Sequence, residues 1–265
     1  MNLDTPTVAE HLRRNGFHVT AGIVDAAIAA YQSWHGLEVT GEIDGPTART
    51  ILAPRSCGHP DVMAVSDNLA KWPDPAIRYH VANPGGFPGL TSEQAVAAFG
   101  WAWDQWANVC GIAPEYTTNP AKAHVVIECA RIDRPGQVLA WSELADGTAR
   151  QKGQRYDAAE AWTLHQGASV PRQKIDLGRV AAHEIGHVLG IPHIASGNLL
   201  QPLYDPAIWT PQAGDVREAR ERYGPPLRPA APPPEPPAGG WTVTLEGTGN
   251  LTNVVVPGFR VTRIA

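Results

Sequence analysis

The sequence of 265 residues predicts an α+β fold, an α/β sandwich with a mixed, twisted sheet, preceded by a small unit of three helices. Three observations support this prediction. Apolar residues recur at helical spacing near the N-terminus, strand and helix patterns alternate through the middle, and a proline-rich stretch closes that part. A chain of this length can bury a core of about 150 residues.

The N-terminal part carries three short helical patterns between Thr7 and Leu52. Val8 and Leu12 fall on one face of the first, and apolar residues from Ile23 to Trp34 mark the second. Asp44-Gly45-Pro46 opens the third, because proline at an early helical position loses no hydrogen bond.

The middle of the chain mixes strands and helices from about Trp72 to Gly224. The predicted elements are strand Ile77–Val81, helix Ser92–Asn108, strand His124–Glu128, a strand around Gln137–Ser142, helix Leu177–Leu189 and a helix near Asp215–Tyr223. We therefore expect an N-terminal unit (1–61), a central domain (62–224), a proline-rich linker (225–240) and a short β-rich tail (241–265).

Composition excludes several classes of function. The net charge of −5 leaves no basic face for nucleic acid or anionic lipid, and no apolar run is long enough to span a membrane. The first residues lack the basic start and apolar stretch of a secretory signal. Three cysteines are too few for a disulfide scaffold, and we expect Cys110 and Cys129 to be either paired or both buried.

Residues 183–193 read HEIGHVLGIPH and predict a zinc site. His183 and His187 are four residues apart, so both side chains leave one face of a helix. Gly190 can end that helix in the left-handed conformation and bring round His193 as third ligand, which leaves the fourth position for water. Glu184 is then placed to act as general base.

Two other interpretations of these histidines are possible, a chance match and a structural zinc site. A chance match of this pattern is rare, and a structural zinc site with four protein ligands usually contains cysteine, of which none is nearby in sequence. A catalytic metal is therefore the interpretation that we favour.

The extended histidine motif resembles that of the metzincin clan, and further features resemble the matrixins. Residues 54–61, PRSCGHPD, resemble the matrixin cysteine switch Pro-Arg-Cys-Gly-x-Pro-Asp with Ser56 inserted. The resemblance implies that Cys57 is the inhibitory fourth zinc ligand of a zymogen, and a thiolate binds zinc tightly. Residues 31–44 resemble the peptidoglycan-binding-like helical prodomain of the same family. The implied activity is that of a zinc-dependent endopeptidase acting on proteins.

The sequence departs from the matrixin pattern at three further positions. Leu200 stands where matrixins have the methionine beneath the zinc, whereas Pro202 and Tyr204 resemble the wall of the primed-side substrate pocket. Trp141 and Arg155 stand at two histidine positions of the second, structural zinc, so we expect that site to be absent.

An adjacent calcium site is expected from the same resemblance. Residues 132–136 resemble Phe-Asp-Gly-Pro-Gly, and residues 157–162 resemble Asp-Asp-Asp-Glu-x-Trp. Asp133, Asp157 and Glu160 would supply oxygen ligands to a structural Ca²⁺ ion. The alternative is that these are three solvated surface carboxylates.

The alternative is a function of another class, in which the N-terminal helices bind cell-wall glycan and the peptidase is vestigial. Glu184 and Cys57 favour an active enzyme, because a degenerate site seldom keeps its general base and needs no inhibitor. Ile194 after the third histidine does not fit astacin-like or adamalysin-like enzymes. The family resemblance implies an extracellular or cell-surface location.

Overall fold

The computed structural model describes residues 3–20, 24–62, 70–164 and 174–227. Its helices are α1 (Thr5–Arg14), α2 (Asp25–Trp34), α3 (Gly45–Ile51), α4 (Ser92–Ala107), α5 (Leu177–Val188) and α6 (Ala213–Tyr223), with short 3-10 turns at Pro84–Gly86 and Pro120–Lys122. Its strands are β1 (Arg55–Cys57), β2 (Ala76–Val81), β3 (Ala113–Tyr116), β4 (Val125–Ala130), β5 (Val138–Ser142), β6 (Lys152–Asp157), β7 (Trp162–Thr163) and β8 (Ile175–Asp176).

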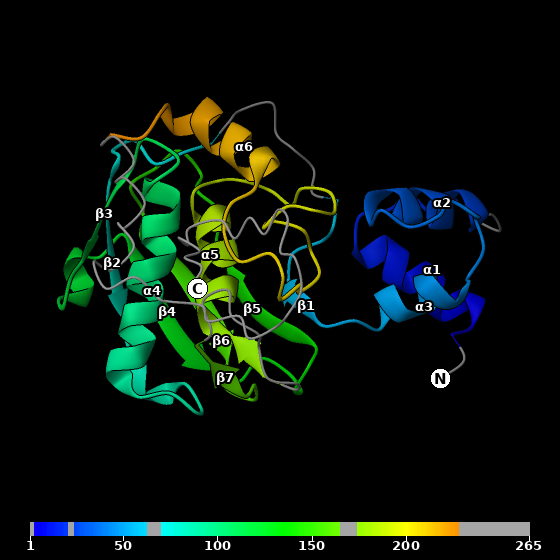
Figure 1. Cartoon of the computed structure of the whole chain (residues 1–265), viewed down its shortest axis with the longest axis horizontal. Coiled ribbons are helices and arrows are strands. Elements are labelled where there is room, and N and C mark those ends of the chain that lie inside the picture. Colours follow the sequence, from blue (N-terminus) through cyan, green and yellow to red (C-terminus); the bar gives the residue numbers. More distant parts are fainter. Residues whose placement is uncertain (1–2, 21–23, 63–69, 165–173, 228–265) are drawn as a thin grey trace, which may run out of the picture. The chain divides into compact units, whose positions relative to one another are not determined.

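Six of the described strands form one sheet in the order β1-β5-β6-β4-β2-β3. The β5–β6 pair is antiparallel and the other pairs are parallel, so the sheet is mixed. Helices α4 and α5 pack against each other, and Figure 1 shows both in front of the sheet. The predicted α+β class is confirmed.

The core of this sheet-and-helix body is rich in aromatic side chains. Helix α4 begins with a capping box between Thr91 and Gln94, which satisfies two backbone N–H groups at its start. It buries Trp103 and Trp106, and Trp106 Nε1 donates to the carbonyl oxygen of Ala182 in α5 at 2.7 Å. This contact fixes the helix that carries the histidine motif.

The three N-terminal helices have a separate small core. Asp4 and Asp44 cap α1 and α3 by accepting hydrogen bonds from the backbone N–H groups of Thr7 and Thr47. The buried apolar side chains are Val8, Leu12, Phe17, Ala27, Ile28 and Tyr31. The predicted helix that opens at Asp44-Gly45-Pro46 is therefore present.

Cys110 and Cys129 are free and buried, the second of the two alternatives expected. Burial raises the pKa of each thiol to about 12, so both are inert thiols at neutral pH. Apart from residues 225–227, the predicted linker and tail lie outside the described residues.

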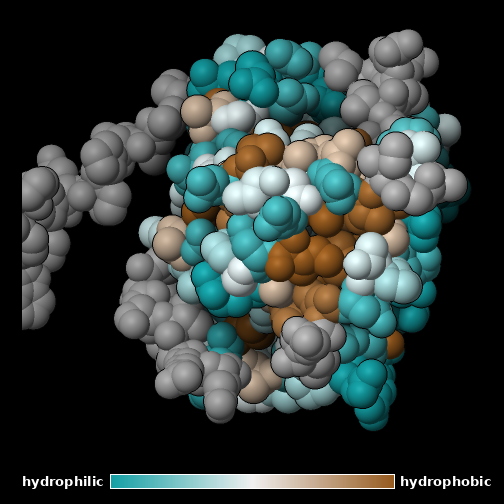
Figure 2. Space-filling view, turned by 90° about the vertical axis from the view of Figure 1, so that its right-hand side faces the viewer, coloured by the Kyte–Doolittle hydropathy of each residue, from teal (hydrophilic) through white to brown (hydrophobic). Residues whose placement is uncertain are grey.

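Large apolar side chains are exposed at few of the described positions, namely Val39, Leu52, Tyr116 and Leu227. On the face drawn in Figure 2, hydrophobic residues gather in one area and hydrophilic residues surround it. Within the described ranges, no helix is long and apolar enough to cross a membrane.

Candidate metal centre and active site

Helix α5 and the turn after it bring the three motif histidines together. Asp176 caps the helix by accepting a hydrogen bond from Arg179 N at 3.0 Å. Gly190 has a φ of +84°, and a Cβ atom there would lie 2.2 Å from the carbonyl oxygen of Ala70, so only glycine fits. The chain therefore turns sharply and returns with His193.

Each histidine ring is oriented by a backbone carbonyl. The Nδ1 atoms of His183, His187 and His193 lie 2.8, 2.8 and 2.6 Å from the carbonyl oxygens of Leu199, Ile191 and Pro60, respectively. An N–H on Nδ1 donates to the carbonyl, which leaves the lone pair of Nε2 for a metal. The expected ligand atoms thus face one another.

Cys57 completes this group of ligand atoms. Its Sγ lies 3.0 Å from His193 Nε2 and 3.4 Å from His187 Nε2, and the Nε2 atoms of His183 and His187 are 3.1 Å apart. Tetrahedral zinc, with bonds of about 2.0–2.1 Å to nitrogen and 2.3 Å to sulfur, sets donors roughly 3.3–3.6 Å apart. The four donors, all within 4.8 Å of one another, fit one zinc ion after small side-chain adjustments.

The charge of this group also suits a cation. Burial lowers the pKa of all three imidazoles, that of His187 to about 3, so the rings are neutral. Burial raises the pKa of the Cys57 thiol well above its ordinary value. Neutral imidazoles and a thiol that a bound cation can deprotonate are the ligands that zinc prefers.

Glu184 lies beside this group, and the described residues engage only one of its two carboxylate oxygens. Its Oε2 accepts a hydrogen bond from Ser142 Oγ at 2.7 Å, and Gln154 Nε2 donates to the same hydroxyl at 3.0 Å. Oε1 is buried and has no partner among the described residues. Burial raises the pKa of Glu184 to about 8, which suits a group that exchanges protons near neutral pH. Neither Ser142 nor Gln154 belongs to a motif that the sequence reveals.

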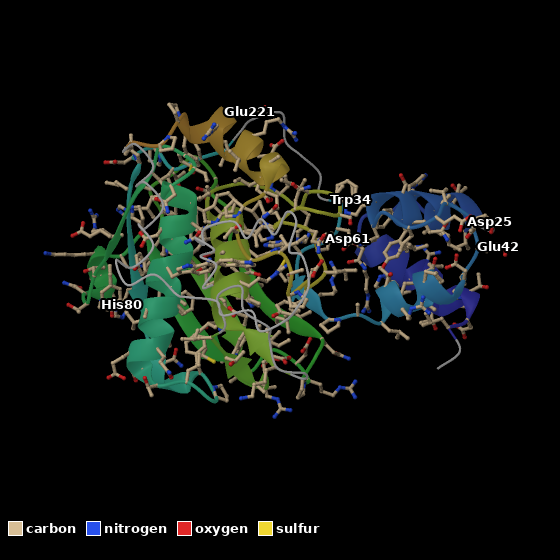
Figure 3. The ribbon with its side chains drawn as sticks, viewed as in Figure 1. Asp25, Trp34, Glu42, Asp61, His80 and Glu221 are labelled. Atoms are coloured by element: carbon tan, nitrogen blue, oxygen red, sulfur yellow. The ribbon has the colours of Figure 1, made fainter. Side chains whose placement is uncertain are left out.

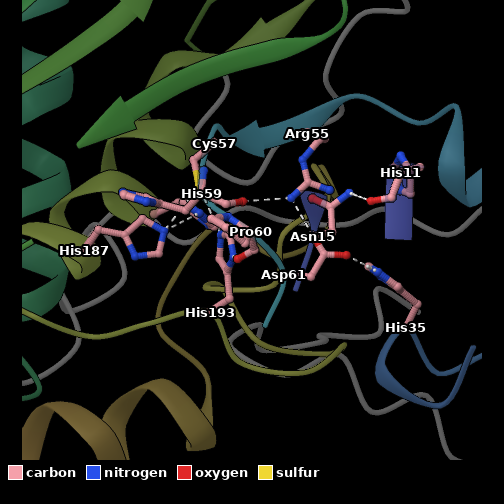
Figure 4. Close-up of polar contacts among 11 residues, drawn as sticks. His11, Asn15, His35, Arg55, Cys57, His59, Pro60, Asp61, His187 and His193 are labelled. Atoms are coloured by element: carbon pink, nitrogen blue, oxygen red, sulfur yellow. Dashed lines mark hydrogen bonds and ion pairs between the residues drawn. The ribbon is translucent and has the colours of Figure 1, made fainter. Parts of the chain in front are cut away.

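Residues 54–61, here called the switch segment, are attached to the body at several points. Strand β1 pairs in parallel with β5, and Arg55 bridges to Leu203 on its other side. The buried Asp61 carboxylate forms an ion pair with Arg55 and a hydrogen bond with His35 Nε2 at 2.8 Å (Figure 4). These contacts join the segment both to the sheet and to helix α2.

Asp61 is charged in this setting. Burial alone raises its pKa, but the hydrogen bond from His35 and the charge of Arg55 outweigh it and hold the pKa below its ordinary value. Figure 3 shows Trp34 and Asp61 near each other, whereas Asp25 and Glu42 lie away from them. The carbonyl oxygen of Trp34 accepts from Ser196 N at 3.2 Å, close to the turn that follows His193.

The three residues expected at a substrate pocket lie in the segment after His193. Leu200 is fully buried beneath α5, where a Cβ atom on Gly186 would meet its side chain at 2.6 Å. Pro202 accepts a hydrogen bond from Ser56 N through its carbonyl oxygen at 2.8 Å, and Tyr204 N donates to Pro54 O at 3.1 Å. The switch segment therefore runs between β5 and the strip that contains Pro202 and Tyr204.

Asp215 in α6 holds the turn beneath the metal centre. Its carboxylate oxygens accept hydrogen bonds from Leu199 N at 2.7 Å, Leu200 N at 3.1 Å and Gln212 N at 2.7 Å. Leu199 in turn supplies the carbonyl that orients His183. No local sequence pattern reveals this role, because only folding brings Asp215 to the turn.

The three carboxylates expected to bind calcium lie in neighbouring loops, where backbone N–H groups donate to them. Asp157 accepts from Ile132, Asp133 and Ala159, while Gly136 N donates to Glu160 at 2.7 Å. Asp133 Oδ1 is buried without a partner among the described residues. In the described part of the chain, only Cys57 and the three histidines place their ligand atoms close enough together to hold one metal ion.

Trp141 and Arg155 lie side by side on paired strands, as cross-strand partners of β5 and β6. The Arg155 guanidinium carbon is 5.7 Å from the centre of the Trp141 ring and forms an ion pair with Glu128 of β4. These two residues thus make a cation–π and ionic contact across three strands.

Comparisons with known proteins agree with this geometry. Residues 71–224, more than half of the chain, match the protein-family profile described as Peptidase_M10, Matrixin. Interstitial collagenase of Sus scrofa is 29% identical over 253 residues, which cover 87% of this chain and 49% of that protein. Metalloendoproteinase 1-MMP of Arabidopsis thaliana is 29% identical over 192 residues, 65% of this chain and 52% of that protein.

A second interstitial collagenase, that of Bos taurus, is 28% identical over 250 residues, 87% of this chain and 48% of that protein. The chain thus spans about half the length of the curated relatives it matches. Because the family profile covers strands β2 to β8, helix α5 and the histidine motif, the chain belongs to the matrixin family of peptidases.

Proposed function

We propose that this protein is a zinc-dependent metalloendopeptidase that hydrolyses peptide bonds in proteins and is made as a zymogen inhibited by Cys57. The observation that carries the proposal is the convergence of three oriented imidazoles and one thiol beside a buried carboxylate with a free oxygen. Residues 1–61 would form the inhibitory prodomain and residues 62–224 the peptidase domain.

In the proposed mechanism His183, His187 and His193 hold the metal, which when bound supplies the Lewis acid that polarises the peptide carbonyl and acidifies water. Glu184 Oε1 accepts the proton of the attacking water, while Ser142 holds Oε2 still. Oε1 then gives the proton to the leaving amine. Cys57 Sγ blocks this chemistry as long as it occupies the position that water needs.

The test is to measure zinc content and casein cleavage by the full chain, before and after a thiol-reactive reagent modifies Cys57. We expect about one zinc per chain and cleavage that starts only after modification. Zinc-loaded chain that cleaves no protein substrate after modification would contradict the proposal.

We also propose a structural Ca²⁺ site at Asp133, Asp157 and Glu160. Its support is that the three carboxylates lie in neighbouring loops and that the buried Asp133 Oδ1 lacks a partner among the described residues. We expect terbium bound at this site to luminesce and calcium to displace it. Asp157→Asn should abolish the luminescence. Unchanged luminescence in Asp157→Asn would place the ion elsewhere.

An extracellular or cell-surface location is proposed on the basis of the family alone. The comparisons give no support to glycan binding by the N-terminal helices, so the proposal does not include it. Protein substrates remain the proposed partners.

A further inference from the structure

Three polar side chains of β5 and β6, here called the relay, form a hydrogen-bonded chain that ends on Glu184. Ser142 and Gln154 are directly opposite each other in the antiparallel pair of strands, and Tyr156 lies two residues further along β6 on the same face. The Tyr156 hydroxyl donates to Gln154 Oε1 at 3.4 Å, and Gln154 Nε2 donates to Ser142 Oγ at 3.0 Å. Ser142 Oγ then donates to Glu184 Oε2 at 2.7 Å. The register of the sheet therefore places the relay against α5.

The chemistry of the groups gives the relay a single direction. As a general base Glu184 starts ionised, and an ionised carboxylate only accepts hydrogen bonds. A hydroxyl has one proton, so the Ser142 proton points at Oε2 and the lone pairs of Oγ face the Gln154 amide. Burial raises the pKa of Tyr156 well above its ordinary value, so the phenol keeps the proton that it donates to Gln154 Oε1. Tyr156 thus fixes the amide, and the amide fixes the hydroxyl.

The relay is buried and belongs wholly to the body that carries the metal centre. Ser142 and Gln154 are 1% exposed, and Tyr156 is fully buried with its ring centre 5.1 Å from that of Phe99. The switch segment meets the relay only through the backbone, because His59 Nε2 lies 2.6 Å from the carbonyl oxygen of Ser142. The relay therefore does not depend on the switch segment and is available to the activated enzyme.

We propose that Gln154 and Tyr156 are positioning residues for the peptidase reaction, which act through the Ser142 hydroxyl and hold Glu184 with Oε1 as the oxygen that exchanges protons. The inference rests on the proposed peptidase function and adds residues to it that no sequence motif reveals. Oε2 is engaged by Ser142, whereas Oε1 has no partner among the described residues. Without the hydroxyl the carboxylate can turn about its last bond, and the base is less often where the water has to be.

The first test measures kcat and KM for a fluorogenic peptide, with the zinc-loaded full chain after Cys57 has been modified. Ser142→Ala should lower kcat about 10- to 100-fold and change KM less than about twofold, because the hydroxyl positions the base and does not bind substrate. Gln154→Met has a similar length but no donor, and should lower kcat about 3- to 10-fold. The double variant should be no slower than Ser142→Ala, since Gln154 acts through that hydroxyl.

Matched variants separate the hydroxyl from the packing of the strands. Threonine and valine have the same shape, so Ser142→Thr should exceed Ser142→Val in kcat by about 10-fold, and equal values overturn the inference. The exposed controls Ser33→Ala and Gln137→Met should keep the kcat of the parent chain. If Ser142→Ala fails to fold, an unchanged kcat in Gln154→Met overturns the inference by itself.

The outcomes distinguish this inference from the function on which it rests. A parent chain that holds zinc and cleaves no peptide after modification of Cys57 contradicts the peptidase function. A parent chain that cleaves, together with Ser142→Ala at the same kcat, overturns the relay and leaves the peptidase function standing.

The second test needs no activity and uses the full-length zymogen. The side-chain amide of Gln154, identified in a ¹H–¹⁵N spectrum by its loss in Gln154→Met, should exchange its protons slowly with water because it is buried. Ser142→Ala and Tyr156→Phe each remove one hydrogen bond of this amide and should speed the exchange about 3- to 10-fold, whereas Ser33→Ala should not. Exchange that is unchanged in both Ser142→Ala and Tyr156→Phe overturns the relay.

Discussion

Glu184 and Asp215 are two buried carboxylates whose surroundings give them different tasks. Both oxygens of Asp215 accept backbone N–H groups, so this side chain is fully engaged in holding a turn. Glu184 has one oxygen held by Ser142, and its other oxygen has no partner in the described part of the chain. A free oxygen on a fixed carboxylate can take up a proton without rearrangement, which suits a general base.

We predict that Glu184→Ala abolishes peptide hydrolysis and leaves about one zinc per chain, because Glu184 handles protons and is not a ligand. Casein cleavage and metal analysis of the thiol-modified chain measure the two effects. The exposed Glu221→Ala is the matched control and should keep full activity. Residual activity of Glu184→Ala above a few per cent of the parent would identify another group as the base.

Asp215→Ala is predicted to destabilise the protein by at least about 2 kcal/mol, because it leaves three backbone N–H groups without their acceptor. Chemical unfolding monitored by tryptophan fluorescence gives the free energy of unfolding. The exposed Asp25→Ala should change it by no more than about 0.5 kcal/mol. Equal losses in the two variants would mean that the Asp215 turn contributes little to stability.

Among the secondary-structure elements, β1 is the one that connects the N-terminal helices to the metal centre. It adds a parallel strand to β5 and carries Cys57 at its end. Asp61 then fastens the following residues to Arg55 and His35. The short strand and the ion pairs together resist withdrawal of the thiol.

Cys57→Ser should raise the activity of the full-length chain, because a neutral hydroxyl binds zinc far more weakly than a thiolate and lets water return. Cleavage of a fluorogenic peptide before any processing is the measurement. Equal latency in Cys57→Ser and the parent chain would show that the helical unit blocks the site by itself.

Asp61→Asn should weaken the attachment of the switch segment to the rest of the protein, because Arg55 and His35 lose the negative charge between them. Removal of one partner of a buried ion pair costs about 3 kcal/mol. The rate at which Cys57 reacts with a chromogenic disulfide should therefore rise at neutral pH. Glu42→Gln, which removes a charge elsewhere in the helical unit, serves as control, and a rate unchanged in Asp61→Asn would contradict this reading.

On the scale of the whole molecule, the metal centre joins parts of the chain that are far apart in sequence. Cys57 comes from the switch segment and the histidines from α5 and the turn after it. A ligand that binds only the folded state stabilises it by mass action, and the gain grows with its concentration over Kd. Zinc at this centre should thus stabilise the whole described body.

Removal of zinc by a chelator is therefore predicted to lower the melting temperature of the full chain and to speed the reaction of the Cys57 thiol. His187→Ala, which lacks one ligand, should already melt low and respond little to the chelator. Differential scanning calorimetry with and without added zinc makes the comparison. A melting temperature that is independent of zinc would argue against a metal held by these four residues.

The sequence by itself determined the features that depend on local spacing. His183 and His187 share a helix face because they are four residues apart, and the glycine after the helix can turn the chain towards His193. The helix starts at Asp44 and Thr91 follow from capping residues. The α+β class follows from the alternation of strand and helix patterns.

Only the tertiary structure decided the features that depend on contacts between distant segments. Strand β6, with the sequence KGQRYD, lacks an apolar alternation and is a strand because it pairs with β4 along its whole length. Ser142 beside Glu184 and Ser56 against Arg179 meet across 42 and 123 residues of chain, respectively. No periodicity encodes such pairs, because they arise when the sheet places β1 and β5 beside α5.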